Sequence, residues 1–313
     1  MTPANRWVAI LLFALPLAAQ QAADLAFQPP IGPPAHTAGQ GPRIAVDQAH
    51  HNFNTAEGRY LPFAALLRRD GYRVTGFTVP FTRESLQGVD ILVIANALHA
   101  RNAEDWNPPN PSAFLASEIQ AVHHWIEQGG SLFLIVDHMP FPGAAGELAR
   151  TLGFHFSNGF AVTASGGLPS PFTFEASSGL AVGPATLGAG PGERVTRVVT
   201  FTGSAFRAPK AALPVLSLGP DHVSLEPLKP WEFTPATPRI PVEGWSQGAL
   251  LEIGKGRVAV FGEAAMFTAQ EAGPARMKVG MNAPGAEQNV RLLLNLVHWL
   301  GRSGSARKGE ARP

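Results

Sequence analysis

The sequence predicts an α/β fold with a mainly parallel, doubly wound sheet that carries a β- and loop-rich insertion. From Arg43 onwards, short apolar runs alternate with stretches of helical periodicity, the pattern typical of β-α-β units. This alternation stops at about residue 154 and resumes at about residue 248. With 45% hydrophobic residues in 313, the chain has enough apolar side chains to bury a large core. We therefore expect one α/β domain over residues 43–301, with an insertion over residues 154–248.

In the first half of the domain, the sequence predicts three strands and one helix. Residues 43–46 form a first strand, and residues 60–70 place apolar side chains at helical spacing until Gly71. Residues 73–79 form a second strand. Residues 90–95 are an almost uninterrupted apolar run, which indicates a strand buried on both faces.

The next elements continue the same alternation. A helix is expected to begin at Ser112 and to end at Gly129-Gly130. Residues 131–136 predict a fourth strand, and residues 142–152 a short helix. After the insertion, residues 249–253 and 257–262 predict a tight hairpin, and residues 286–300 an amphipathic closing helix.

The predicted insertion shows no strong helix, and proline-rich turns divide its short β-like pieces, such as residues 194–202 and 215–218. We interpret it as loops and antiparallel strands added to the core, and a separate small domain is the alternative. Its Trp231, Phe233 and Trp245 are residue types favoured at interfaces, so a protein partner could bind there.

Both ends of the chain differ from the domain in composition. Arg6 followed by the apolar residues 7–19 predicts a signal peptide over residues 1–22, with cleavage near Ala19 or Ala22; a retained short anchor is the alternative. We expect an exported protein, periplasmic or extracellular, with no transmembrane segment in the mature chain. Residues 23–42, rich in proline and glycine, predict a linker. Residues 302–313 predict a basic, disordered tail.

Composition excludes several classes of function. The chain has no cysteine, which excludes disulfides, thiolate metal sites and a cysteine nucleophile. The formal net charge is +1, and the excess positive charge lies in the leader and the tail. The remaining body gives no electrostatic reason to expect nucleic-acid binding.

Three polar clusters directly follow predicted strands, where ligands bind in open parallel sheets. The first follows the strand at residues 43–46, the second is Asp137-His138, and the third is centred on Glu263. We expect catalytic roles for Asp137, His138 and Glu263, and ligand-binding roles for His50, His51, Asn52, Asn54, His99 and Asn282. The structural alternatives are a polar loop that caps a helix, an Asp137 that only accepts turn N–H groups, and a loop or cap role for Asn282.

The same residues also suggest a possible divalent metal ion, held by Asp47, His50, Asp137 and His138 with Glu263 as a general base. Their spacing matches no compact metal-binding motif. No glycine-rich phosphate loop follows the first strand, so we expect no nucleotide cofactor.

The β-α-β series, the phrase Gly129-Gly130-Ser131-Leu132 and the hairpin at Gly256-Arg257-Val258 resemble the class I glutamine amidotransferase-like superfamily, which implies a flavodoxin-like sheet. Within it, the chain is most similar to exported bacterial domains of unknown function related to the module of gliding-motility and intraflagellar-transport proteins. The resemblance covers residues 43–153 and 248–301. It implies a nucleophile at the elbow where this chain has Asp137-His138-Met139, so glutaminase activity is excluded.

Three hypotheses of function follow. Cysteine-free members of the superfamily resemble sugar- or polymer-binding modules, which favours a protein that binds a small polar ligand, such as a carbohydrate or a cell-envelope polymer. The alternative is a metal-assisted or acid–base hydrolase that uses the polar clusters. A third possibility is a structural envelope protein that presents residues 154–248 to a partner.

Overall fold

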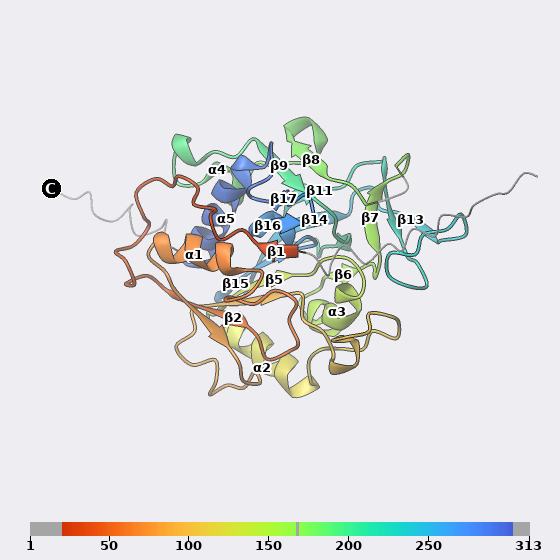
Figure 1. Cartoon of the computed structure of the whole chain (residues 1–313). Helices are drawn as coiled ribbons and strands as arrows, with labels where there is room; N and C mark the ends of the chain where they lie inside the picture. Colours follow the sequence, from red (N-terminus) through yellow and green to blue (C-terminus); the bar gives the residue numbers. More distant parts are fainter. Residues whose placement is uncertain (1–20, 167–168, 303–313) are drawn as a thin grey trace, which may run out of the picture.

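The computed structural model describes residues 21–166 and 169–302, which form a mixed α/β structure around a mostly parallel central sheet (Figure 1). Its parallel strands occur in the spatial order β3-β2-β4-β5-β15, so the second strand precedes the first and the others follow in sequence. This is the strand order of flavodoxin-like sheets. The parallel strands are β2 (Arg43–Asp47), β3 (Arg73–Phe77), β4 (Ile91–Ala95), β5 (Ser131–Ile135) and β15 (Gly256–Phe261).

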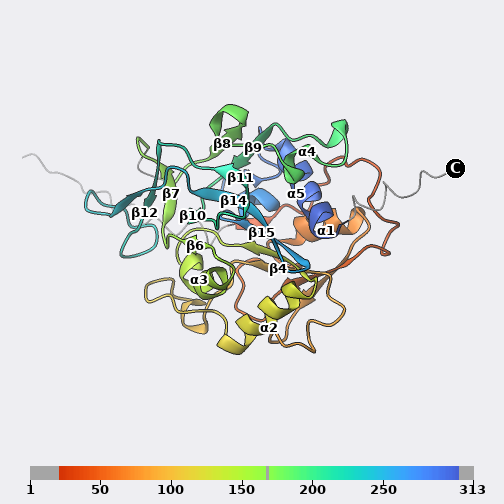
Figure 2. The same cartoon turned by 180° about the vertical axis from the view of Figure 1, so that it is seen from behind.

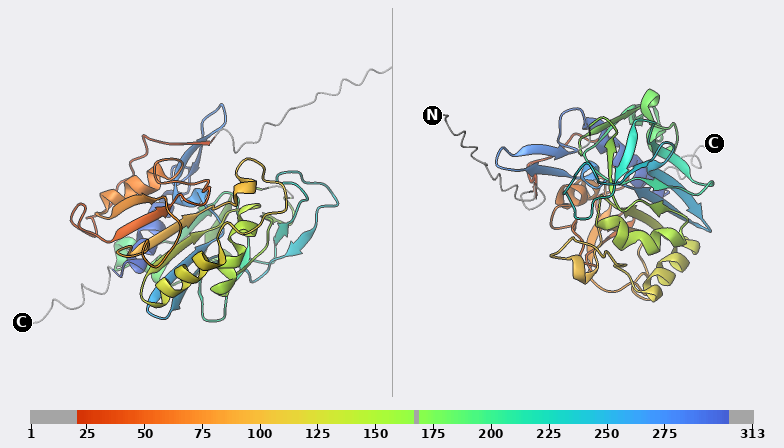
Figure 3. Two further views of the ribbon diagram at one scale, coloured as in Figure 1. Left: turned by 90° about the horizontal axis from the view of Figure 1, so that it is seen from below. Right: turned by 90° about the vertical axis from the view of Figure 1, so that its right-hand side faces the viewer.

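Helices cover both faces of this sheet (Figures 1 and 2). The helices α1 (Leu61–Arg69) and α5 (Glu287–Leu300) contribute Phe63 and Leu293 to one buried apolar cluster. The helices α2 (Ala116–Glu127) and α3 (Phe141–Thr151) contribute to the cluster on the opposite face, and Figure 3 (left) shows the molecule from the side of α2. All residues of β4 and β5 are buried because both faces of these strands are covered, as their apolar sequences predicted.

The predicted insertion supplies strands to the central sheet. Antiparallel strands β14, β10 and β6 extend the sheet beyond β15, and β11 also pairs with β14. Other parts of the insertion form small antiparallel sheets. The strands of the insertion are β6 (His155–Phe156), β7 (Phe160–Thr163), β8 (Phe172–Glu175), β9 (Arg197–Thr200), β10 (Phe206–Arg207), β11 (Leu213–Ser217), β12 (His222–Leu225) and β13 (Arg239–Pro241). Strand β14 (Ser246–Ile253) begins at the end of the insertion and contains the first strand of the predicted hairpin.

Helical segments outside the four main helices are short. The insertion contains α4 (Pro184–Leu187), in agreement with the absence of a strong helical pattern there. Single turns of 3-10 helix are η2 (Ala100–Asn102), η3 (Ala176–Ser178), η4 (Pro191–Glu193) and η5 (Ala265–Phe267). In the described part of the chain, no helix is long and apolar enough to span a bilayer.

The N-terminal described residues are attached to the domain. Strand β1 (Gln21–Ala23) pairs with β16 (Ala269–Ala272), which pairs with β17 (Met277–Gly280). The Asp24 carboxylate then accepts hydrogen bonds from Lys278 and Asn282. The segment expected to be a linker continues along the domain, where Phe27 and Ile31 pack against the core. Apart from Gln21 and Ala22, the predicted signal peptide lies outside the described residues, as does the tail after Arg302.

Two predicted boundaries were wrong. Helix α2 begins at Ala116 and not at Ser112, because the Glu118 side chain accepts a hydrogen bond from the Leu115 N–H at 2.9 Å and caps the helix there. The Ser112 hydroxyl bonds instead to the backbone of Phe114. Strand β3 ends at Phe77, and the predicted last residue, Val79, is 48% exposed.

Candidate functional site

Four neighbouring parallel strands end in polar residues at one edge of the sheet, which we call the carboxyl edge. Asp47 is the last residue of β2, and Asn96 follows β4 directly. Asp137 lies two residues after β5, and Glu263 two residues after β15. Because these strands are parallel and adjacent in the sheet, the structure brings the four residues to the same edge.

The first cluster forms a buried chain of hydrogen bonds. The Nδ1 atom of His50 lies 2.9 Å from both carboxylate oxygens of Asp47, and Nε2 lies 3.0 Å from Oε1 of Glu118. Glu118 also accepts hydrogen bonds from the backbone N–H groups of Phe81 and Leu115. His50 is 7% exposed and Asp47 is fully buried. Both ring nitrogens of His50 are therefore occupied within the protein.

The hydrogen bonds between Asp47, His50 and Glu118 stabilise the charged forms of His50 and Glu118. Burial alone would lower the pKa of His50, but the hydrogen bonds and charges of Asp47 and Glu118 outweigh burial and raise it. Burial alone would raise the pKa of Glu118, but hydrogen bonds from Leu115, His50 and Phe81 lower it. The geometry therefore favours an imidazolium between two carboxylates, an arrangement that holds the edge together.

The other predicted ligand-binding residues are divided among several places. Asn52 donates to Asp47 and accepts from the His50 N–H, so it also belongs to the buried chain. His51 is exposed, and Asn54 is 2% exposed and forms no side-chain hydrogen bond within the described residues. The Nδ1 atom of His99 accepts from the Arg101 N–H as the cap of η2.

Asn282 forms its hydrogen bonds with the N-terminal segment and with β16. Its amide donates to Asp24 and to the carbonyl of Gln270, so it connects the N-terminal segment with β16.

Asp137 is held at the edge by its neighbours. Its N–H donates to Oδ1 of Asn96 at 2.9 Å, and its own Oδ1 accepts the N–H of His138 at 2.8 Å. The Thr202 hydroxyl lies 3.4 Å from the same oxygen. Asp137 is 7% exposed, so its carboxylate reaches solvent only in part.

Glu263 is fully buried beside this carboxylate. Its oxygens accept hydrogen bonds from the N–H groups of Ala265 and Met266, at 2.9 and 2.7 Å. Burial and the charge of Asp137 nevertheless raise the pKa of Glu263 well above its ordinary value. Burial and the neighbouring Asp137 therefore favour the neutral form of Glu263, whereas the two backbone N–H groups favour its charged form.

His138 lies among four aromatic rings, and we call these five residues the His138 cluster. Its Nδ1–H donates to the carbonyl oxygen of Met139 at 2.7 Å, so in the neutral ring Nε2 is a hydrogen-bond acceptor. The centroid distances from His138 are 4.5 Å to Phe160, 4.7 Å to Trp231, 5.9 Å to Phe141 and 6.1 Å to Trp106. Phe160 stacks on the imidazole at 12°, whereas Trp231 meets it edge to face.

The predicted metal ligands fall into two groups with different partners. Asp47 and His50 bond to each other, while Asp137 and His138 lie beside Asn96 and the aromatic rings. Within residues 21–166 and 169–302, no three His, Asp or Glu side chains are arranged to hold a metal ion. The geometry gives no support to a metal centre built from these four residues.

The sequence analysis missed two kinds of residue at this edge. Asn96 follows the apolar run of β4 directly, so the rule that found Asp137 also applied to it. Trp106, Phe160 and Trp231 come from loops and an inserted strand, and no local pattern connects them with His138. Trp231 was noted only as a possible interface residue.

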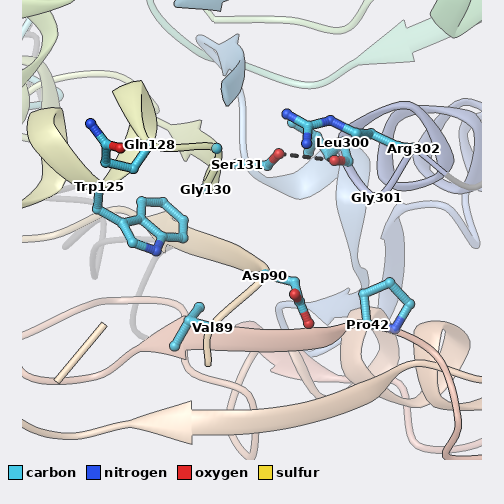
Figure 4. Close-up of a pocket in the computed structure, with 11 residues that line it drawn as sticks. Pro42, Val89, Asp90, Trp125, Gln128, Gly130, Ser131, Leu300, Gly301 and Arg302 are labelled. Carbon is cyan, nitrogen blue, oxygen red and sulfur yellow. Dashed lines mark hydrogen bonds between the residues drawn. The ribbon is translucent and has the colours of Figure 1, made fainter. Parts of the chain in front are cut away.

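A cavity of about 260 Å³ lies at the opposite, amino edge of the sheet (Figure 4). Its lining includes Trp125, Asp90 and the ends of α2 and α5. The Ser131 hydroxyl beside it donates to the carbonyl of Leu300 at 2.9 Å. None of the polar residues at the carboxyl edge contributes to this cavity.

No protein-family model matches the chain, and no curated protein matches its sequence. A solved structure described as the mmIFT52 N-terminal domain is similar, with a TM-score of 0.56 and 15% identity over 87% of this chain and 100% of that one. A ThuA-like protein from Bacteroides uniformis has a TM-score of 0.48 and 15% identity, over 86% of this chain and 95% of that one. A cytoplasmic protein from Salmonella typhimurium LT2 has a TM-score of 0.49 and 12% identity, over 82% of this chain and 98% of that one.

The first of these similarities extends further than the sequence suggested. Residues 43–153 and 248–301 are about half of the chain, whereas the match to the mmIFT52 domain covers 87% of it. The similarity is consistent with the amidotransferase-like fold that the sequence suggested, and at 15% identity it concerns the fold alone.

Proposed function

We propose that this chain is an exported carbohydrate-binding protein that holds a saccharide of the cell envelope against the His138 cluster. The observation that carries the proposal is His138, 6% exposed, whose Nε2 forms no hydrogen bond within the described residues and whose ring lies among aromatic rings at the carboxyl edge. Sugars combine apolar C–H faces, which pack on aromatic rings, with hydroxyl groups that need hydrogen-bond partners. The His138 cluster offers both kinds of contact.

Two tryptophans give the cluster a contact surface. Trp231 is 38% exposed, and Trp106 is partly exposed. Trp231 has a φ of 68°, a conformation that is unfavourable for a bulky residue, so the surrounding loop must hold it in place. Backbone strain of this kind is concentrated at binding sites. Asp137, a neighbour that is 7% exposed, has oxygen atoms that can accept hydrogen bonds from sugar hydroxyl groups.

Acid–base hydrolysis is the second candidate, and the neighbouring carboxyl groups of Asp137 and Glu263 favour it. The pKa of Glu263 is raised by burial and by the nearby Asp137, and two carboxyl groups with different environments are the arrangement that acid–base catalysis uses. Against this reaction, Glu263 is fully buried and both its oxygens accept backbone hydrogen bonds. Such a group supports the structure of the edge more readily than it donates a proton to a substrate.

A structural role through residues 154–248 is the third candidate. The loop that carries Trp231 also exposes Leu228, which is 88% accessible. Several strands of this segment, however, belong to the central sheet, so it does not form a separate binding unit. We therefore rank a protein partner below a saccharide.

The test is the binding of the purified protein to a panel of neutral and acidic saccharides, including peptidoglycan fragments, measured by isothermal titration calorimetry. Trp231→Ala should weaken binding of the best saccharide at least tenfold, because one face of the sugar loses its aromatic contact. Leu228→Ala, in the same loop, is the matched control and should bind like the wild type. Absence of binding across the panel, or equal loss in the two variants, would contradict the proposal.

A further inference from the structure

Arg59 is a half-buried cation without a carboxylate partner among the described residues. Its guanidinium carbon lies 3.8 Å from the centroid of the Phe53 ring. One terminal nitrogen donates weakly to the Phe53 carbonyl oxygen at 3.5 Å, and the buried Nε has no hydrogen-bond partner. By contrast, Arg68 and Arg197 each have a glutamate oxygen within 2.8 Å.

This arrangement is costly in the free protein. Burial lowers the pKa of Arg59, and no neighbouring carboxylate compensates for it. The cation–π contact with Phe53 stabilises the charge in part, but a ring face cannot satisfy the N–H donors of a guanidinium. A negatively charged group from outside the chain would compensate the charge and could accept hydrogen bonds from the terminal N–H groups, although not from the buried Nε.

Arg59 lies beside the proposed saccharide site. The Phe53 ring on which it stacks contacts Trp106 at 5.5 Å and Phe141 at 5.9 Å, and both of these rings belong to the His138 cluster. Helix α1 begins two residues after Arg59, with no acidic residue in its first turn and no side-chain cap. The positive end of the helix dipole therefore adds to the charge of Arg59 at the same place.

We propose that Arg59 is the anion subsite of this site and holds a carboxylate or phosphate substituent of the bound sugar. The planar guanidinium can form two parallel hydrogen bonds with either group. The preferred ligands are then acidic saccharides, such as uronic acids or sugar phosphates. This inference rests on the proposed function, because it names the class of saccharide that the His138 cluster receives.

The test compares neutral sugars with their charged counterparts by calorimetry: glucose, glucuronic acid and glucose 6-phosphate, and the same pairs for the best sugar of the panel. The wild type should bind at least one charged form ten or more times as tightly as the neutral form, about 1.4 kcal/mol. Arg59→Gln should remove this preference and leave affinity for the neutral sugar unchanged. Arg101→Gln, which removes an exposed arginine from the same edge, should retain it.

The outcomes separate this inference from the proposed function. The charged form that binds more tightly identifies a carboxylate or a phosphate as the natural substituent. Neutral sugars that bind as tightly as charged ones would overturn the anion subsite and leave the saccharide site intact. If no sugar binds, but inorganic phosphate or acetate raises the melting temperature of the wild type and not of Arg59→Gln, the anion subsite stands and the saccharide site falls.

If no sugar binds, and neither phosphate nor acetate raises the melting temperature of the wild type, both proposals are overturned. Arg59→Lys gives a second variant if Arg59→Gln does not fold. It keeps the charge but loses the planar pair of donors, so its preference for the charged sugar should be intermediate. A preference equal to that of the wild type would show that the paired donors are not used.

Discussion

The Nε2 atom of His50 lies 3.0 Å from Oε1 of Glu118, a residue of a helix 68 positions further along the chain. On its other side, the same imidazole bonds to Asp47 at the end of β2. Phe81 and Phe114 pack against the ring at 4.6 and 4.8 Å, which excludes water. This histidine thus connects β2 to the N-terminus of α2 and fixes the loop that leads towards Arg59.

Removal of His50 should destabilise the fold strongly. His50→Ala leaves two buried carboxylates without their shared cation, and we expect a loss of about 3–5 kcal/mol in the free energy of unfolding. Chemical denaturation measures this loss. His99→Ala removes a partly exposed cap residue and should cost about 1 kcal/mol or less. Similar losses in the two variants would contradict the structural role of His50.

The stability due to His50 should depend on pH. Its pKa is raised in the folded protein, so this contribution is complete below the ordinary value of 6.5 and is lost as pH rises through the raised pKa. The lowered pKa of Glu118 has the opposite effect: its contribution is present above 4.5 and is lost as pH falls. The difference in unfolding free energy between wild type and His50→Ala should therefore be largest between these values. A difference independent of pH would contradict this assignment.

Glu263 should make the protein less stable as pH rises. Its pKa is raised in the folded state, so the unfolded chain loses this proton first, near the ordinary value of 4.5. The unfolding free energy of the wild type should fall relative to that of Glu263→Gln as pH increases from 4.5 towards neutrality. Glu104→Gln, at an exposed position, is the control and should follow the wild type. Parallel curves for wild type and Glu263→Gln would exclude a retained proton.

If the chain is exported, its processing site should leave β1 intact. Cleavage after Ala22 would remove two of the three residues that pair with β16, whereas cleavage after Ala19 would keep them all. We therefore expect the mature protein to begin at Gln20. Intact mass of the secreted protein measures this directly. A mature chain that begins at Ala23, or a chain with no processing, would contradict the prediction.

The sheet could be predicted from the sequence because its fully buried strands consist of apolar residues. The runs of β4 and β5 are apolar throughout, and the structure buries each of their residues. The start of α2 could not be read in the same way. The cap there is the Glu118 side chain, which also bonds to His50 and to the Phe81 N–H. Judged from neighbouring residues alone, Ser112 is the better cap, because serine is a common N-cap residue.

Only those site residues that lie at the ends of strands could be predicted from the sequence. The rule that strand ends carry function found Asp47, Asp137 and Glu263, and it would have found Asn96. The rule could not distinguish an exposed ligand-binding residue from a buried residue that stabilises the fold, because that difference depends on contacts with residues far away in the sequence. Trp231 is 93 positions from His138, and only the folded chain of the insertion brings the two rings within 4.7 Å.

The affinity of the best saccharide for the His138→Gln variant tests the central claim most directly. Calorimetry should show at least a tenfold loss relative to the wild type, because the acceptor nitrogen and the stacked ring both disappear, while circular dichroism shows the fold unchanged. His155→Gln, at an exposed position of β6, should bind like the wild type. Wild-type affinity in folded His138→Gln would contradict the claim that the carboxyl edge binds a sugar at this histidine.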